Sequence, residues 1–115
     1  MRTITKAASE GHAGARIALD VFCFRLSRCI GGIAMSLPRI DALVFTGGIG
    51  ENSAAVREQV LHNLQLLGYR VDTEKNSCNG KNTNGIISSD HTPLAMVIPT
   101  NEELLIALDT EALVR

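Results

Sequence analysis

The sequence predicts a protein of the α/β class, because two short apolar segments that read as buried strands alternate with segments of helical periodicity. The strands are expected at residues 42–45 and 94–98, with helices before, between and after them. The 115 residues suffice for one domain with a hydrophobic core but not for two. Hydrophobic residues make up 45% and charged residues 20%, a composition typical of a soluble globular protein.

The N-terminal third is predicted to be helical, with a short helix at residues 3–9 that is interrupted near Gly11. A long, mostly buried helix is expected over residues 12–37, because apolar side chains recur there at steps of three and four: Ala15, Leu19, Phe22, Leu26, Cys29, Ile33 and Leu37. Gly31 and Gly32 would each cost about 1 kcal/mol relative to alanine in a helix interior. They therefore indicate the close approach of another element, or a bend. Pro38 is expected to end the helix.

The middle of the chain predicts a buried strand at 42–45 and a second helix from about residue 52 to 67. One face of this helix carries Val56, Val60, Leu64 and Leu67. Gly68 stands where a left-handed C-cap belongs. Residues 69–72 resemble a short strand, 73–85 a polar loop rich in turns, and Ile86 and Ile87 the start of another strand.

The last predicted helix follows the strand at 94–98, which Pro99 ends. Thr100 and Glu103 match a capping box, in which each side chain satisfies a backbone N–H of the first helical turn. The apolar face of this helix consists of Leu104, Leu105, Leu108, Ala112 and Leu113. The predicted order is therefore α-β-α-β-(β)-β-α in one layered unit.

Charge and cysteine content limit the possible partners and the location. The net charge of −1, with both signs mixed along the chain, predicts no nucleic-acid or anionic-membrane surface. Asp20, Arg25 and Arg28 interrupt the longest apolar stretch, which excludes a membrane span or signal peptide there and favours a cytoplasmic location. The three cysteines, without CxxC spacing, are interpreted as buried thiols in a reducing compartment rather than as disulfide or zinc ligands: Cys23, Cys29 and Cys78. The histidines are interpreted as surface or capping residues: His12, His62 and His91.

The segment TGGIGENS, at residues 46–53, joins a predicted strand to a predicted helix through three glycines. Unpaired N–H groups and the positive end of the helix dipole would converge there, and glycines let the backbone approach a ligand closely. This favours an anion or nucleotide site. The segment lacks the Lys-Ser/Thr of a P-loop and is not a GxGxxG motif, so a purely structural glycine turn remains an alternative.

The segment IPTNEEL, at residues 98–104, also follows an apolar strand and places two carboxylates in the first turn of a helix. Capping explains Glu103 but leaves Glu102 free to hold Mg²⁺ through water beside a nucleotide phosphate. Ligands of open α/β sheets bind at the carboxyl edge of the strands, so both segments are expected to meet on that edge. The alternative is that both carboxylates only cap the helix and interact with its dipole.

These two segments carry a resemblance to a known family. The chain resembles the acetate kinase and propionate kinase family in the helix EGHAGARIALDVFCFRLSRCIGG, in DALVFTGGIGENSAAVREQVLHNLQLLGYRVDTEKN and in the C-terminal VIPTNEELLIALD. The resemblance covers essentially the whole chain. It implies that residues 1–115 are a single unit, the C-terminal nucleotide-side portion of such a kinase. The implied fold is part of an actin-like ATPase (ribonuclease H-like) domain, of the superfamily that includes acetate and sugar kinases.

The resemblance also implies roles for individual residues. Members of the family transfer a phosphoryl group between ATP and acetate or propionate, with Mg²⁺. Their glycine-rich turn contacts the adenosine part of the nucleotide, which corresponds here to Gly48, Ile49, Gly50, Glu51 and Asn52. Glu102 corresponds to a glutamate of the magnesium site. Arg2 matches the end of an Asp-x-Arg tripeptide that lines the nucleotide pocket, and its aspartate partner is absent from this sequence.

The catalytic clamp of the family, an asparagine, two arginines and a histidine, has no counterpart in this sequence. Four further arginines match no motif and are expected on the surface: Arg25, Arg28, Arg57 and Arg70. No catalytic residue is therefore assigned, and the chain alone is expected to be inactive. The resemblance implies a homodimer formed through this region. The alternative is a non-catalytic module that binds adenine nucleotides or dimerises, and the sequence does not distinguish acetate from propionate.

Overall fold

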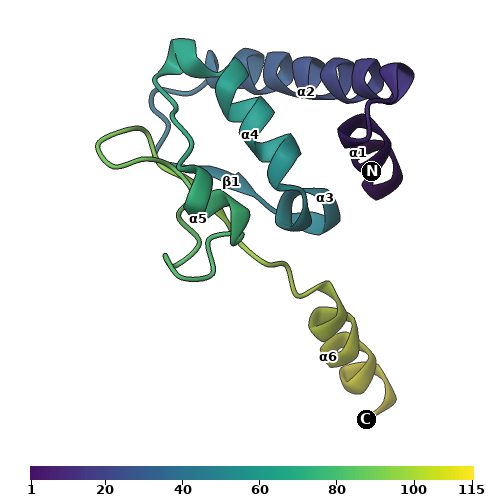
Figure 1. Ribbon diagram of the computed structural model, residues 1–115. Helices are drawn as coiled ribbons and strands as arrows, with labels where there is room; N and C mark the ends of the chain where they lie inside the picture. Colours follow the sequence, from purple (N-terminus) through teal and green to yellow (C-terminus); the bar gives the residue numbers. More distant parts are fainter.

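A computed structural model describes residues 1–115 of the protein and confirms a mixture of helices and sheet (Figure 1). The elements along the chain are α1 (Arg2–Ser9), α2 (Ala13–Ala34), β1 (Leu43–Phe45), α3 (Gly47–Asn52), α4 (Ala54–Asn63), the 3₁₀ helix η1 (Gln65–Leu67), α5 (Thr73–Ser77), β2 (Ala95–Val97) and α6 (Glu102–Val114). No helix is both long enough and apolar enough to cross a membrane.

The sheet is formed by β1 and β2, which run parallel in the register Leu43–Ala95 to Phe45–Val97. Both strands were predicted, and both are confirmed. Segment 85–87 borders the other edge of β2, where Ile87 N–H donates to the Ala95 carbonyl at 2.9 Å. The predicted strand at 69–72 is reduced to a single antiparallel bridge between Val71 and Ser88. Val44 is 43% exposed while its neighbour Phe45, on the opposite face, is buried, so the strand is not buried on both faces as expected.

The core lies where α2 and α4 pack together over the sheet. Its buried residues are Ala8, Leu19, Cys23, Phe45, Val56, Val60, Leu61, Leu64, Tyr69, Ile87, Ala95 and Val97. Helix α2 packs against both α1 and α4. The prediction of one apolar face on α4 is therefore confirmed for Val56, Val60 and Leu64.

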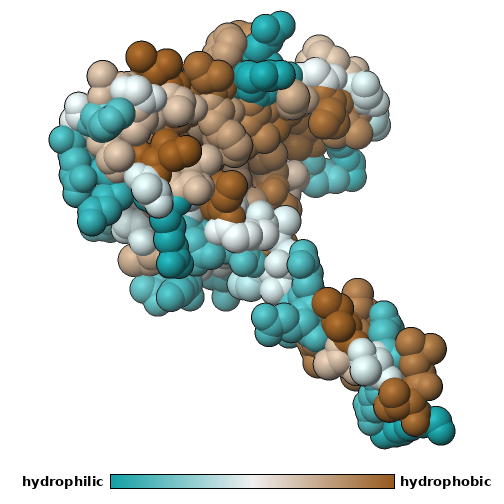
Figure 2. All heavy atoms as spheres, turned by 90° about the vertical axis from the view of Figure 1, so that its right-hand side faces the viewer, coloured by the Kyte–Doolittle hydropathy of each residue, from teal (hydrophilic) through white to brown (hydrophobic).

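The prediction that the long helix is mostly buried is wrong. Only Leu19, Cys23, Ser27 and Ala34 of α2 are buried, and the other side is in contact with solvent. Ile17 and Ile33 are 63% and 65% exposed, and Figure 2 shows such hydrophobic side chains on the surface of the body. The helix runs unbroken through Gly31 and Gly32, and no atom beyond the helix lies within 4 Å of a Cβ placed at either residue. No other part of the chain therefore makes the predicted close approach.

The region after β1 differs from the predicted single helix. The glycine-rich residues themselves coil into α3, and α4 begins only after Ser53, whose Oγ accepts from Val56 N–H at 3.4 Å. Gly68 has φ +91° and forms the predicted left-handed cap after η1. The predicted polar loop also contains a helix, α5, which begins because the Asp72 carboxylate accepts from Lys75 N–H at 3.0 Å.

Helix α6 extends away from the rest of the molecule in Figure 1, and all of its residues are exposed. The predicted capping box is wrong, because the N-cap is Asn101, whose Oδ1 accepts from Leu104 N–H at 3.3 Å. Thr100 lies before the helix, and its N–H donates to the Glu51 carboxylate instead. The five residues of the predicted apolar face therefore form no part of the core.

The cysteines and histidines match their predictions only in part. Cys23 is a buried free thiol as expected, but Cys29 and Cys78 are exposed free thiols. Residue 29 lies on the solvent side of α2, and residue 78 follows the last turn of α5. His12 is the N-cap of α2, with Nδ1 accepting from Ala15 N–H at 3.1 Å, and the other two histidines are exposed, as predicted.

Candidate functional site

The carboxyl ends of the two parallel strands lie side by side and bring together the segments that follow them. Ile98 N–H donates to the Phe45 carbonyl at 3.0 Å, just beyond the sheet. The Glu51 carboxylate accepts from Thr100 N–H at 2.5 Å and from Thr100 Oγ at 3.4 Å. The expectation that segments 46–53 and 98–104 meet at one edge of the sheet is confirmed.

The three glycines of α3 have different structural reasons. Gly47 has φ +72°, a conformation that side chains with a Cβ rarely adopt. A Cβ at Gly50 would lie 3.1 Å from the Phe45 carbonyl carbon, so the helix can pack this closely on the strand only with glycine there. Gly48 is exposed, and a Cβ there would have open space around it. Packing and backbone conformation therefore explain Gly47 and Gly50 but not Gly48.

A groove of about 320 Å³ lies between α1 and α3. Its lining consists of Met1, Arg2, Thr5, Gly48, Ile49, Asn52 and Ser53. The structure thus brings together four of the residues for which the sequence predicts nucleotide contacts, from segments almost fifty positions apart. Gly50 and Glu51 lie outside this lining, because one packs on Phe45 and the other binds Thr100.

The groove combines surfaces of different chemistry. Ile49 is 40% exposed and offers an apolar surface beside the bare main chain of Gly48. Asn52 Nδ2 donates to the Gly48 carbonyl at 3.0 Å, and Arg2 contributes an exposed guanidinium. Such a lining suits a ligand that has both a flat apolar part and an anionic part. The volume is at the lower end of ordinary ligand pockets, which start at about 300 Å³.

Glu102 is the first residue of α6, two positions after Thr100, and it is exposed. No three acidic, histidine or cysteine side chains of the structure converge as a metal site. A single carboxylate nevertheless fits Mg²⁺, which is commonly bound through one or two protein carboxylates, with phosphates and waters as the other ligands. The prediction for Glu102 thus depends on nucleotide phosphates that would supply further ligands of the ion.

Sequence reasoning missed two features of this region. Thr5 lines the groove because it is three residues from Arg2 on α1 and shares its helix face, a spacing that was visible in the sequence. Arg57 was expected on the surface but is completely buried, and its guanidinium donates to the Gly50 carbonyl at 2.8 Å. Its position four residues before buried Leu61 was the available signal.

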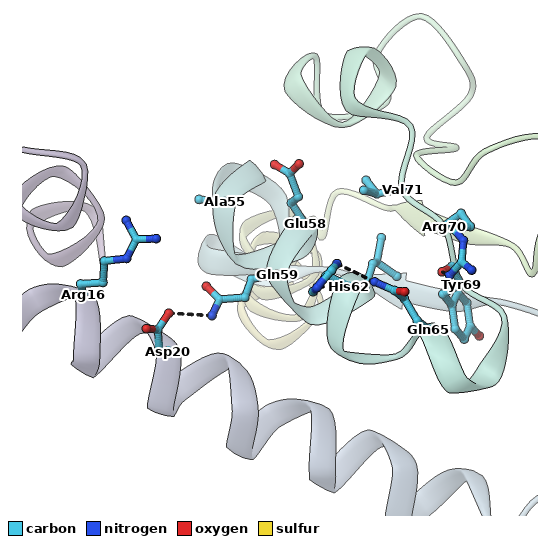
Figure 3. Close-up of a pocket in the computed structure, with 11 residues that line it drawn as sticks. Arg16, Asp20, Ala55, Glu58, Gln59, His62, Gln65, Tyr69, Arg70 and Val71 are labelled. Atoms are coloured by element: carbon cyan, nitrogen blue, oxygen red, sulfur yellow. Dashed lines mark hydrogen bonds between the residues drawn. The ribbon is translucent and has the colours of Figure 1, made fainter.

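A larger hollow of about 550 Å³ lies between α2 and α4 and contains none of the predicted nucleotide or metal residues. Figure 3 shows its mixed charges, with Arg16 and Asp20 on α2, Glu58 and Gln59 on α4, and Gln59 pointing toward Asp20. Gln59 Nε2 donates to Asp20 Oδ1 at 2.8 Å. The side chains that bridge this hollow therefore connect the two helices.

The parallel strands, their covering helices and the shared carboxyl edge define an α/β protein, and its similarity to solved structures identifies it as part of a domain with the actin-like ATPase fold. Comparisons with known proteins agree. The model of the acetokinase family matches residues 1–108, and the chain belongs to this family. The sequence is 50% identical over 113 residues to acetate kinase of Stutzerimonas stutzeri and 49% identical over 114 residues to acetate kinase of Deinococcus radiodurans.

Solved structures show the same similarity. A propionate kinase from Francisella tularensis superposes with a TM-score of 0.83 at 39% identity, over 92% of this chain and 27% of that one. The two curated acetate kinases are matched over 98% and 99% of this chain but over only 29% of their own length. The chain thus spans less than a third of the relatives that it matches.

Proposed function

We propose that residues 1–115 form the nucleotide-side portion of an acetate or propionate kinase and bind ATP and ADP in the groove between α1 and α3. The observation that supports this most directly is the shared lining of that groove. Arg2, Gly48 and Asn52 come together there from two separate segments, and each matches a nucleotide position of the family.

In this proposal the adenosine moiety lies against Gly48 and Ile49, where the backbone is bare and an apolar side chain is exposed. Arg2 would attract the phosphates, since its guanidinium is permanently charged and reaches the same groove. Gly50 and Glu51 would act through the backbone that they hold in place. Glu51 fixes Thr100, and so helps to position the start of the C-terminal segment.

Magnesium would be held by Glu102 through water, beside the nucleotide phosphates. The bound ion would supply positive charge that neutralises the phosphate oxygens. The protein contributes the anchored segment before α6, in which Thr100 is tied to Glu51 and the Asn101 side chain caps the helix. The carboxylate of Glu102 is left free for a ligand because the N-cap role belongs to Asn101.

We further propose that the 115-residue chain has no kinase turnover by itself. Phosphoryl transfer needs cationic groups that clamp the equatorial oxygens. Arg57 is unavailable for this role because its guanidinium is buried and already bonded. Arg2 is the only arginine or lysine in the groove lining, so the chain offers one side-chain cation there where the family uses two arginines and a histidine.

A second candidate function is a module that dimerises through this region. Exposed apolar side chains on α2 and along α6 favour it, including Phe24, Leu105 and Leu113. Figure 2 shows hydrophobic side chains over the surface of the projecting α6. The exposed thiols of Cys29 and Cys78 are compatible with the reducing cytoplasm in which we place either function. Light scattering during size-exclusion chromatography tests this candidate. A mass twice the chain's 12.3 kDa would support a dimer, and a monomer at all concentrations would contradict it.

The nucleotide proposal is tested by titrating the labelled protein with MgATP while its amide NMR signals are recorded. We expect saturable shifts of the Gly48, Ile49 and Asn52 amides. GTP at the same concentration serves as a specificity control. Amides that line the larger hollow, such as those of Glu58 and His62, should not move. If the α3 amides do not respond to MgATP, the proposed function is wrong.

A further inference from the structure

Arg57 of α4 is the largest side chain that the fold buries completely, and the family resemblance assigns it no role. Its guanidinium makes four hydrogen bonds. Nε donates to Asn76 Oδ1 at 2.7 Å, Nη1 to the Gly50 carbonyl at 2.8 Å, and Nη2 to the Asn76 carbonyl at 2.8 Å and to Asn79 Oδ1 at 2.5 Å. One side chain therefore connects α3, α4, α5 and the turn after α5.

This cation is buried without any carboxylate partner, since all four acceptors are neutral oxygens. Burying a charge is costly unless hydrogen bonds satisfy it, and here desolvation lowers the pKa of Arg57 from its ordinary value. Gly50 and Asn76 lie in the last turns of α3 and α5, where carbonyl groups are free to accept bonds from outside the helix, and the Asn76 carbonyl also accepts from Asn79 N–H at 3.0 Å. The guanidinium thus binds the negative ends of two short helices at once.

The network has two parts with different consequences. Asn76 Nδ2 also donates to the Ala54 carbonyl at 2.9 Å, so α5 stays attached to the start of α4 without Arg57. The link to α3 is different. Helix α3 is joined to this network by one hydrogen bond only, from the Arg57 guanidinium to the Gly50 carbonyl. Loss of the guanidinium should therefore loosen α3 more than α5.

We propose that Arg57 is a positioning residue that holds α3 in the orientation in which Gly48, Ile49 and Asn52 line the groove. The inference rests on the proposed function, since the groove is the proposed nucleotide site. Arg57 touches no ligand in this scheme. It acts through the Gly50 carbonyl, and Asn79 orients the guanidinium from the opposite side.

The experiment uses Arg57→Ala, which leaves a cavity of guanidinium shape, with methylguanidinium as the added probe. We expect the α3 amide signals to shift and broaden in the variant without any nucleotide, and the Kd for MgATP to rise about tenfold, equivalent to 1.4 kcal/mol. Methylguanidinium should restore both properties, while methylammonium at the same concentration should not. Arg70→Ala is the matched control, because Arg70 is exposed and lies outside the groove lining.

A second variant guards against the failure of Arg57→Ala to fold. Asn79→Gly removes one acceptor of the guanidinium, and glycine tolerates the φ of +55° at this position. We expect smaller shifts of the same α3 amides and a smaller loss of MgATP affinity. A purely structural role would instead lower the melting temperature in both variants with unchanged α3 amides and unchanged Kd, and that result would overturn the proposal.

Failure of the proposed function would give a different pattern. If the original protein binds no MgATP but its α3 amides respond to Arg57→Ala and recover with methylguanidinium, the positioning role stands and the nucleotide assignment falls. If MgATP binds but neither variant changes the α3 signals or the affinity, the positioning role falls and the nucleotide assignment stands.

Discussion

The Glu51 carboxylate accepts a hydrogen bond from the backbone N–H of Thr100 at 2.5 Å, across a separation of 49 residues. This bond joins the glycine-rich helix α3 to the segment before α6, directly beyond the paired ends of β1 and β2. It fixes the relative positions of the proposed nucleotide groove and the proposed magnesium ligand. Together with the bond from Ile98 N–H to the Phe45 carbonyl, it holds the two segments at the carboxyl edge of the sheet.

Removing the contact should loosen the C-terminal segment selectively. We expect Glu51→Ala to accelerate hydrogen exchange of the Thr100 amide and to reduce the free energy of unfolding by about 1 kcal/mol, the usual net value of a hydrogen bond. Glu51→Gln retains an oxygen acceptor and should lose less. Glu58→Ala, which removes an exposed carboxylate of α4, serves as the control. Unchanged Thr100 exchange in Glu51→Ala would show that the bond does not hold the segment in solution.

The meeting of these two segments was predictable from the sequence, and the bond that holds them was not. Two apolar segments followed by polar residues predict parallel strands with a common carboxyl edge. Thr100, in contrast, matched a capping box with Glu103, because the Thr-x-x-Glu spacing is a local pattern. The competing acceptor for its N–H comes from Glu51, and a partner so distant along the chain leaves no local signal.

Valine substitutions at two glycines of α3 should have different effects, one on ligand binding and the other on stability. Gly48→Val should leave stability within a few tenths of a kcal/mol, since its surroundings are open and valine has the better helix propensity. It should nevertheless weaken MgATP binding about tenfold or more. Gly50→Val should instead destabilise the protein by about 1–3 kcal/mol, because its side chain would overlap the Phe45 backbone.

Thermal unfolding and MgATP titration of both valine variants provide the measurements. If Gly48→Val binds MgATP as well as the original protein does, then the nucleotide does not need the space that glycine leaves at this position. A stable Gly50→Val protein would contradict the close packing of α3 on β1.

The buried side chains of Cys23 and Tyr69 predict that the stability of the protein depends on pH. Burial, together with the charge of Asp20, raises the pKa of Cys23 above its ordinary value of 9.0, and burial raises the pKa of Tyr69 above 10.0. Because both groups are neutral when protonated, their contribution to stability is complete below about pH 9 and is lost as the unfolded chain ionises at higher pH. The free energy of unfolding should therefore fall above pH 9, first through Cys23 and then through Tyr69.

Urea titrations between pH 7 and 11 measure this effect, and Cys23→Ala should flatten the curve between pH 9 and 10. A thiol reagent provides an independent check at neutral pH. Cys29 and Cys78 should react at once, and Cys23 only on the time scale of unfolding. Three equally fast thiols would contradict the burial of Cys23.

The limits of sequence reasoning are clearest for α2 and Arg57. The apolar periodicity of α2 is real, but a pattern reports what a helix can bury and not what the chain provides to cover it. Ile17 and Ile33 are exposed because no other element of this chain lies over them. Arg57 shows the opposite error, since a charged residue is expected on the surface unless its partners are known. Here the partners are carbonyl and amide oxygens of distant turns.

The two neighbouring carboxylates at the start of α6 provide a matched test of the magnesium role. Glu102→Gln should reduce the enhancement of ATP binding by Mg²⁺ about tenfold, while Glu103→Gln should retain it. Both changes remove one charge from the same helical turn, so their interactions with the helix dipole are comparable. Calorimetry of ATP binding with and without Mg²⁺ gives the measurement. Equal losses in both variants would assign the effect to the helix dipole, and no loss in either would exclude Glu102 as a magnesium ligand.

The 115-residue chain by itself should show no kinase turnover. Acceleration of phosphoryl transfer requires a nucleotide, an acyl acceptor and cations that converge on the transferring group. The groove supplies Arg2 as its one charged side chain, and the four bonds of Arg57 keep that guanidinium in the interior. Incubation with ATP, Mg²⁺, acetate or propionate, and hydroxylamine should therefore yield no acyl hydroxamate above a buffer control. Hydroxamate formation that is abolished by Arg2→Ala would show that this chain assembles a working transfer site, and would overturn the separation of nucleotide binding from catalysis.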